Sequence, residues 1–244
     1  MRMRKKKRTP QRLEALGALT VPEDFTREQD PSELFSDSLP LCLEIGCGKG
    51  DFAAGMSLLH PENNFIAMER AQDVIVTAVE KYAVSRSLGE MDTHGGWKAP
   101  DGKIYDGVRW NIPDNAKGNV RFMRADASRL EEIFPPEVFY CIYANFSDPW
   151  TKSGYANRRL THPDYLGRYF RLLMPGGYFR FKTDNTELFD FSLESVEASD
   201  LKLTFSTRDL HKSERAKDNV MTEFEKKFSN EGIPICALEA QKPE

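Results

Sequence analysis

The sequence feature that most constrains the fold is a glycine-rich turn that follows an apolar run. The run LPLCLEI, residues 39–45, predicts a short buried β-strand, and DFAAGMSLL, residues 51–59, predicts a helix. Between them lie Gly46, Gly48 and Gly50, two positions apart. Because glycine permits positive φ and lets a ligand lie against bare backbone, this turn is a candidate ligand site.

The rest of the chain alternates strand-like runs with runs of helical spacing. Strands are predicted at 65–70, 119–130 (with a turn), 138–146, 178–184, 201–210 and 235–240, and helices at 73–86, 162–174, 186–199 and 221–228. Pro175-Gly176-Gly177 is expected to close the second of these helices as a turn. The alternation predicts a Rossmann-like α/β fold, a mostly parallel seven-stranded sheet with helices on both faces. The short connection before the last strand predicts one antiparallel strand near the C-terminus.

Two regions fall outside this alternation. Residues 1–38 form a basic tail with an acid- and proline-rich lead-in, and residues 39–244 form the predicted domain. Within that domain, residues 87–118 contain six glycines and are too long for an ordinary connection, so they predict a surface insertion or lid.

Charge is unevenly distributed along the chain. The first twelve residues carry seven Lys or Arg residues and no acid, and removing these charges from the net charge of −4 leaves −11 on the remainder. A cationic tail on an acidic body can hold a polyanion near a site that is not itself basic. A solvated terminus and a nuclear address are the alternatives.

Composition indicates a cytoplasmic protein without a membrane segment. No apolar run is long enough to span a bilayer, and the basic N-terminus lacks the apolar stretch of a secretory signal. Cys42, Cys47, Cys141 and Cys236 are scattered, which favours reduced core thiols over a disulfide framework or a metal site. No metal ligand set is predicted.

Acidic residues are expected at the ends of the first three strands, beside the glycine turn. Asp51 stands where a dinucleotide-binding turn has its third glycine, and its charge would repel a pyrophosphate. Glu69 could accept hydrogen bonds from ribose hydroxyls, and Asp126 lies where an adenine amino group could bind. Because parallel strands end at the same edge of a sheet, Glu44, Glu69 and Asp126 together predict a site for S-adenosylmethionine. Each feature alone is often only structural.

The fourth predicted strand ends unusually, in Ser147-Asp148-Pro149-Trp150, and Arg158 and Arg159 follow. Asp148 would lie at the same edge of the sheet as the cofactor, and the flat ring of Trp150 would form one wall of the site. The alternatives are a turn-forming aspartate, a tryptophan that packs in the core, and an arginine pair at a solvated helix start.

On these motifs the chain resembles the bacterial tRNA (guanine-N7)-methyltransferases from Leu41 to Ala240, except in 87–118. The resemblance depends on EIGCGKG, NFSDPW with Lys152, RRLTHPDYL, LLMPGG, FKTD and MTEFEKKFSNEGIPI. The chain departs from the family pattern at Thr151, where proline is usual, and at 153–157, often richer in basic residues. The tail and the insertion could compensate for the missing charges.

The resemblance implies a class I methyltransferase that forms 7-methylguanosine in the variable loop of tRNA, as a monomer or homodimer. It assigns Asp148 as the central active-site residue. The cofactor would contact Glu44, Gly46, Gly48, Gly50, Glu69, Asp126, Ala127 and Asp148. The tRNA would contact Lys152, Arg158, Arg159, Asp184, Thr222, Glu223, Phe224 and Glu225.

Guanine N7 carries an exposed lone pair, so its methylation requires no general base. A carboxylate nearby would stabilise the positive charge that develops on the purine, which we assign to Asp148. A second carboxylate, Asp184 or Glu225, would recognise the N1–H and 2-amino group of guanine. The rival predictions are a methyltransferase acting on a small molecule or protein, a nucleotide-sugar or NAD-dependent oxidoreductase, and an RNA-binding protein without catalysis.

Overall fold

The computed structural model describes residues 9–86, 90–91, 97–98, 104–105 and 118–244. The predicted cationic tail up to Arg8 and most of the predicted insertion at 87–118 lie outside the described residues. None of the described helices is long and apolar enough to cross a membrane.

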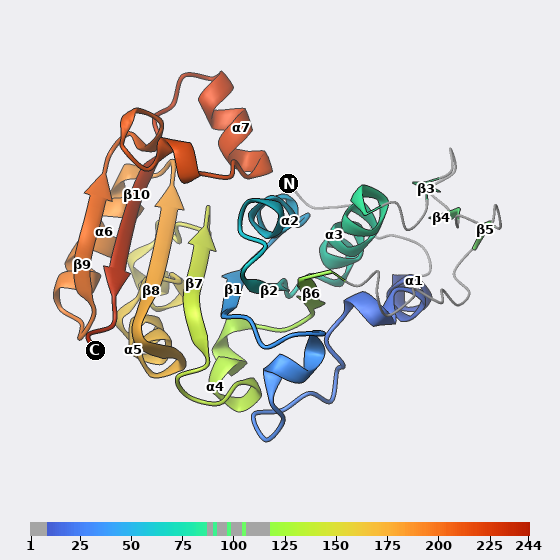
Figure 1. The fold of residues 1–244 in the computed structure, drawn as a ribbon. Coiled ribbons are helices and arrows are strands. Elements are labelled where there is room, and N and C mark those ends of the chain that lie inside the picture. The colour runs from blue at the N-terminus through green and yellow to red at the C-terminus, as the bar shows by residue number, and fades with distance from the viewer. Residues whose placement is uncertain (1–8, 87–89, 92–96, 99–103, 106–117) are drawn as a thin grey trace.

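A seven-stranded sheet forms the centre of the structure (Figure 1). Its strands are β1 (Leu41–Ile45), β2 (Asn64–Met68), β6 (Val120–Met123), β7 (Phe139–Asn145), β8 (Leu173–Thr183), β9 (Lys202–Thr207) and β10 (Cys236–Gln241). They lie in the order β6-β2-β1-β7-β8-β10-β9, and β10 is antiparallel to both of its neighbours. The pairs among β6, β2, β1, β7 and β8 are parallel, so the predicted Rossmann-like sheet with one antiparallel strand is confirmed. A separate small sheet contains β3 (Glu90–Met91), β4 (Trp97–Lys98) and β5 (Ile104–Tyr105).

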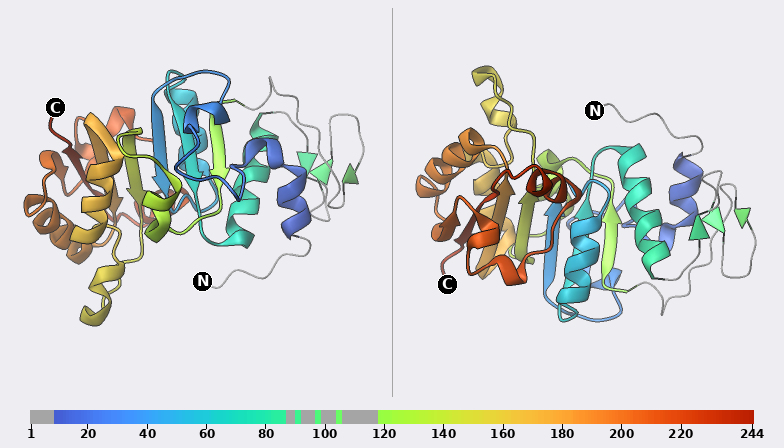
Figure 2. Two further views of the ribbon diagram at one scale, coloured as in Figure 1. Left: turned by 90° about the horizontal axis from the view of Figure 1, so that it is seen from below. Right: turned by 90° about the horizontal axis from the view of Figure 1, so that it is seen from above.

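Helices cover both faces of the large sheet (Figure 2). The α-helices are α1 (Thr9–Ala15), α2 (Asp51–Leu59), α3 (Gln72–Ser85), α4 (Leu130–Ile133), α5 (Pro163–Leu172), α6 (Thr186–Glu197) and α7 (Glu223–Asn230). Short 3₁₀ helices are η1 (Gly17–Leu19), η2 (Pro31–Leu34), η4 (Ala127–Arg129), η5 (Ser153–Arg158), η6 (Leu210–Lys212) and η7 (Ala216–Asp218). Helices α2 and α3 pack on one face of the sheet, over β2 and β6. Helices α5 and α6 pack on the other face, over β8.

Each face of the sheet has its own apolar core. Because side chains alternate along a strand, Leu43 of β1 joins the core under α5 and α6, and Cys42 joins the core under α2 and α3. Glu44 therefore faces α2.

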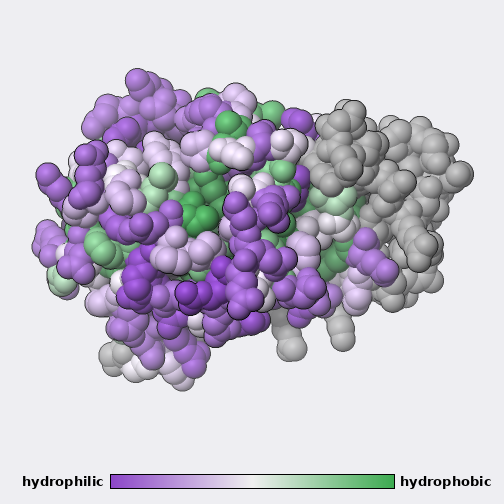
Figure 3. Space-filling view, turned by 60° about the horizontal axis from the view of Figure 1, so that its bottom comes forward, coloured by the Kyte–Doolittle hydropathy of each residue, from purple (hydrophilic) through white to green (hydrophobic). Residues whose placement is uncertain are grey.

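On the face shown in Figure 3, hydrophilic side chains predominate and hydrophobic ones are visible only in small patches.

Local sequence signals set the starts of the helices that surround the site. Asn185 caps α6 by accepting a hydrogen bond from the Leu188 N–H at 2.7 Å. Asp51, at the start of α2, forms an ion pair with Lys81 of α3. A carboxylate in the first turn also complements the helix dipole, so the acid in the third-glycine position has a structural role here.

The lead-in from Thr9 onward packs against the domain. Arg12 of α1 forms a bidentate ion pair with Glu80 of α3, with N–O distances of 2.6 and 2.7 Å. The Val21 N–H donates to the Phe122 carbonyl at 2.8 Å, beside a bridge between Thr20 and Phe122 at the β6 edge of the sheet. These contacts place α1 and the segment up to Val21 near the β6 edge of the sheet, away from β9.

The Pro175-Gly176-Gly177 segment differs from its prediction. It was expected to be a turn that closes a helix, but α5 ends at Leu172 and β8 begins at the next residue, so the three residues lie within that strand. The register with β7 shifts between Phe139 and Cys141, opposite this segment. An irregular pair of strands thus accommodates residues that disfavour regular pairing.

We expect Gly50→Ala to destabilise the protein more than Gly48→Ala. Both glycines have positive φ, 79° and 56°, which costs an alanine about 1–2 kcal/mol. A Cβ on Gly50 would also lie 3.0 Å from both Ala78 and Phe122, whereas one on Gly48 would meet open space. Overpacking adds about 1–3 kcal/mol to the loss, measurable by urea unfolding. Equal losses in the two variants would contradict this account.

Candidate functional site

The glycine turn lies at the carboxyl edge of the sheet and is held by the neighbouring strand. The N–H groups of Gly46 and Cys47 donate to the Met68 carbonyl of β2 at 2.8 and 2.9 Å. Glu69 follows that strand, and its two carboxylate oxygens accept from the N–H groups of Gly48 at 3.3 Å and Ala71 at 2.9 Å. Hydrogen bonds therefore join the glycine turn after β1 to the end of β2, and the space beside Gly46 and Gly48 is open.

Asp126 completes the row of strand-end acids beyond β6. Its Oδ1 accepts hydrogen bonds from the backbone N–H and the hydroxyl of Ser128, at 2.9 and 2.7 Å. These bonds, the backbone one first, hold the pKa of Asp126 below its usual value and keep it ionised. The buried Ala127 begins η4 directly after it. Asp126 thus caps η4 through Oδ1, while its Oδ2 lies 3.9 Å from the Arg70 guanidinium.

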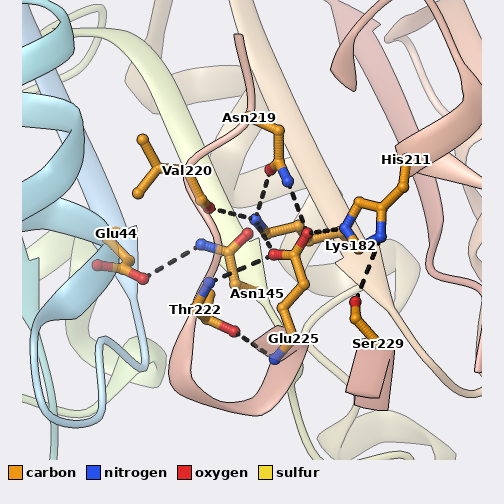
Figure 4. A network of polar contacts seen from close by, with 9 residues as sticks. All are labelled: Glu44, Asn145, Lys182, His211, Asn219, Val220, Thr222, Glu225 and Ser229. Carbon is orange, nitrogen blue, oxygen red and sulfur yellow. Dashed lines mark hydrogen bonds and ion pairs between the residues drawn. The ribbon is translucent and has the colours of Figure 1, made fainter. Parts of the chain in front are cut away.

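Glu44 is a buried carboxylate at the end of β1, with 2% of its surface exposed. Its Oε1 accepts from the Asn145 amide at 3.1 Å, and its Oε2 is buried without a hydrogen-bond partner (Figure 4). Burial raises its pKa to about 7, although the Asn145 hydrogen bond and the charge of Lys182 offset part of the effect. A buried carboxylate oxygen without a partner fits a ligand that brings a positive charge.

Asp148 is exposed and lies in a strained corner after β7. Phe146 and Trp150 have φ values of 51° and 42°, in the left-handed region that bulky residues seldom adopt. The residues on either side of Ser147-Asp148-Pro149 are thus both held in an unfavourable backbone conformation. Strain of this kind concentrates at functional sites, where the surrounding structure must hold it in place.

The Arg159 side chain stabilises this corner through its backbone carbonyls. Its Nε donates to the Pro149 carbonyl at 3.0 Å and its Nη2 to the Trp150 carbonyl at 3.3 Å, and the guanidinium lies 4.4 Å from the centre of the Phe191 ring. The sequence predicted a phosphate contact for both arginines. Arg159 is directed at the turn itself, whereas Arg158 is exposed.

The predicted substrate segment from Thr222 to Glu225 forms the start of α7, through a capping box in which Thr222 and Glu225 bond each other's backbone N–H. Glu223 forms a 2.7 Å ion pair with Lys49, so this segment reaches the glycine turn. Phe224 is 57% exposed. Asp184, half-buried, directly follows β8.

Glu225 itself is fully buried within a polar network (Figure 4). Its carboxylate lies 2.5 Å from the Lys182 ammonium, 2.7 Å from His211 and 2.6 Å from the Asn219 amide. Burial alone would raise the pKa of Glu225, but the Lys182 charge and these hydrogen bonds outweigh it and lower the pKa. Direct recognition of guanine by Glu225, one of the two alternatives from the sequence, conflicts with this burial.

Sequence reasoning missed Asn145, Lys182, His211 and Asn219. Asn145 is the one amide in an otherwise apolar and aromatic strand, and Lys182 is a buried cation near the carboxyl end of β8, so a polar residue at these strand ends is the signal that could have found them. Both also line a cavity of about 370 Å³ beside α2. His211 lies in η6 and Asn219 directly follows η7, and the sequence around them gives no comparable sign. Among the described residues, no group of three or more acidic, His or Cys side chains could hold a metal ion.

Comparisons with known proteins agree with this arrangement. A family described as "Putative methyltransferase" matches residues 38–238. Among solved structures, the 16S rRNA methyltransferase KamB has a TM-score of 0.58 at 12% identity, covering 87% of this chain and 92% of that one. An antibiotic-related methyltransferase has a TM-score of 0.55 at 14% identity, covering 92% of this chain and 96% of that one. Fold and site thus define a Rossmann-like methyltransferase.

Similar curated proteins show which family of methyltransferases the chain belongs to. The tRNA (guanine-N(7)-)-methyltransferase of Listeria monocytogenes is 37% identical over 99% of this chain and 98% of its own length. That of Lachnoclostridium phytofermentans is 38% identical over 85% of this chain and 83% of its own. The chain belongs to the tRNA (guanine-N7)-methyltransferase family, which confirms the resemblance noted in the sequence.

We expect the stabilising contribution of Glu44 to fall as the pH rises from about 4.5 to 7. Native Glu44 keeps its proton in this range and unfolded Glu44, with a pKa near 4.5, releases it. The contribution is complete below pH 4.5 and is lost as the pH passes 7, for a total of about 3 kcal/mol. Glu44→Gln removes this loss, so its unfolding free energy relative to the wild type should rise between pH 4 and 8.

Urea unfolding across this pH range measures the difference. Glu194→Gln, which changes an exposed glutamate of α6, is the matched control for the loss of a charge. An unfolding free-energy difference that is constant with pH for Glu44→Gln would show that Glu44 titrates normally.

Proposed function

We propose that the protein transfers a methyl group from S-adenosylmethionine to N7 of a guanosine in tRNA, and that this guanosine lies in the variable loop. One observation carries the proposal. The glycine turn, the unpartnered Glu44 oxygen and the strained Asp148 corner converge at the carboxyl edge of one parallel sheet, where open α/β folds bind ligands. The family membership supplies the substrate class. We place this activity in the cytoplasm.

Each part of the edge suits one part of the cofactor. The open backbone at Gly46 and Gly48 leaves room for a ligand, and the Glu44 oxygen would accept from its ammonium group. Glu69 would hold the ribose hydroxyls, and Asp126 with the Ala127 backbone the adenine. Gly50 shapes the turn. When bound, S-adenosylmethionine supplies an electrophilic methyl group on a sulfonium.

Asp148 would lie beside the purine during transfer. Guanine N7 attacks with its own lone pair, so no residue has to remove a proton first. The ring becomes cationic as the new bond forms, and the Asp148 carboxylate, on a turn whose carbonyls Arg159 binds, would stabilise that charge. Asp184 would recognise the N1–H and 2-amino group, because Glu225 has no oxygen free to do so.

The RNA would approach across the same edge. Lys152 and Arg158 are exposed cations next to the Asp148 corner and would contact phosphates, which position the RNA without reading its sequence. Thr222, Glu223 and Phe224 at the start of α7 would border the guanosine, and the buried Glu225 would fix their position from below.

The direct test is a tritium-transfer assay with labelled S-adenosylmethionine and bulk tRNA, followed by nucleoside analysis. Label in 7-methylguanosine is the expected result. Label in a small molecule or protein, with tRNA unlabelled, would favour the rival methyltransferase function instead.

We expect Asp148→Asn to lower kcat by about 100-fold or more, since loss of one group that stabilises charge in the transition state commonly costs this much. The melting temperature should stay near that of the wild type, because Asp148 is exposed. Asp164→Asn, which changes an exposed aspartate in the first turn of α5, is the control for a lost carboxylate. Near-normal turnover of tRNA by Asp148→Asn would refute the assigned role.

Lys152→Ala should raise the KM for tRNA several-fold and reduce the salt dependence of tRNA binding by about one unit of slope. The Kd for S-adenosylmethionine should not change. Lys202→Ala serves as control, because Lys202 is exposed at the start of β9, at the opposite edge of the sheet. Weaker cofactor binding with unchanged tRNA binding is the outcome that would contradict this role.

A further inference from the structure

The chain after the Asp148 corner carries aromatic side chains on a projecting element. Both views in Figure 2 show η5, residues Ser153–Arg158, standing out from the body of the molecule. Tyr155 on this element is 42% exposed, and its ring meets Trp150 edge-on, with 6.0 Å between ring centres. The Arg158 guanidinium lies 4.6 Å from the centre of the Tyr155 ring and 5.0 Å from that of Trp150.

This group of Trp150, Tyr155 and Arg158 is a surface feature and no part of a core. Neither ring belongs to the buried clusters on the two sides of the sheet. A tyrosine that leaves 42% of its surface exposed and lies outside the apolar cores gains less from burial than a core residue does. The cation nevertheless holds the ring in a defined orientation.

The surroundings of η5 are cationic, although the chain as a whole is acidic. Between Asp148 and Asp164 the sequence contains no acidic residue and three permanent cations, Lys152, Arg158 and Arg159. In the described part of the chain, no carboxylate forms an ion pair with Lys152 or Arg158. An exposed aromatic ring flanked by unpaired cations suits single-stranded nucleic acid, in which each base has a free face and each phosphate a negative charge.

We propose that Tyr155 is a stacking platform for an unpaired base of the substrate RNA, close to the methylated guanosine. The inference rests on the proposed function and adds to it a contact that the sequence comparison does not assign. Trp150 links the platform to Asp148 through Pro149, so the stacked base would lie within a few nucleotides of the reacting one. Arg158 supports the ring and Lys152 takes a phosphate of the same strand. A paired base offers no free face to the ring, so the platform selects RNA that is unpaired at this point.

Three substitutions separate stacking from packing. Tyr155→Phe keeps the aromatic face, Tyr155→Leu keeps apolar bulk without it, and Tyr155→Ala removes both. We expect the KM for tRNA to rise about five- to a hundred-fold in the Ala and Leu variants, the range that one base–aromatic stack supplies, and to stay near the wild-type value in the Phe variant. kcat at saturating tRNA and the Kd for S-adenosylmethionine should be unchanged in all three. A Leu variant that behaves like the wild type, or an unchanged KM in the Ala variant, would overturn the proposal.

A binding experiment tests the platform without methylation. A single-stranded RNA decamer with one 2-aminopurine should lose fluorescence on binding to the wild-type protein and to Tyr155→Phe, but not to Tyr155→Leu. The same decamer annealed to its complement should show no such difference. Equal quenching by the wild type and Tyr155→Leu would refute stacking even if tRNA is methylated. Conversely, selective quenching together with a failure to methylate tRNA would refute the proposed function and leave the platform intact.

Discussion

The buried ion pair between Lys182 and Glu225 joins the central sheet to the C-terminal segment that covers its carboxyl edge. Lys182 lies near the end of β8, and its ammonium also donates to Asn219 and to the Val220 carbonyl, each at 2.8 Å. One side chain therefore fixes both the loop before α7 and the start of that helix. Removing either partner of a buried pair leaves an uncompensated charge, at a cost of about 3–5 kcal/mol, so the placement of Thr222 to Phe224 depends on this contact.

Two buried carboxylates at this edge are held in opposite states. Glu225 has a lowered pKa because a lysine, a histidine and an amide surround it. Glu44 has a raised pKa because burial outweighs the Asn145 hydrogen bond and the charge of Lys182. The first is a finished structural contact. Glu44 still has one carboxylate oxygen without a hydrogen-bond partner, to which a cationic ligand can bind. Two carboxylates of one site whose pKa values differ in this way commonly have different roles.

The sequence alone was sufficient for the central sheet and for the row of acidic residues after β1, β2 and β6, but not for Asn145 and Lys182 near the ends of β7 and β8. Apolar periodicity and turn residues are local, so the predicted strands and the start of α2 at Asp51 could be read directly. The roles of Glu225 and Arg159 could not, because each depends on partners that only the folded chain brings close: Lys182 lies 43 positions before Glu225, and Phe191 lies 32 positions after Arg159. Pro175-Gly176-Gly177 was misread because a register shift in β8 has no signature in one sequence.

The position of β10 has a consequence for biosynthesis. It follows β8 and β9 in the sequence, yet it lies between them in the sheet, and among the described strands β9 pairs with β10 alone. A nascent chain therefore carries β9 without a neighbour, and β8 with an open edge, until residues 236–241 have left the ribosome. Unpaired edges of this kind invite association with other chains, so the docking of β10 ends the period in which the growing polypeptide exposes these two edges.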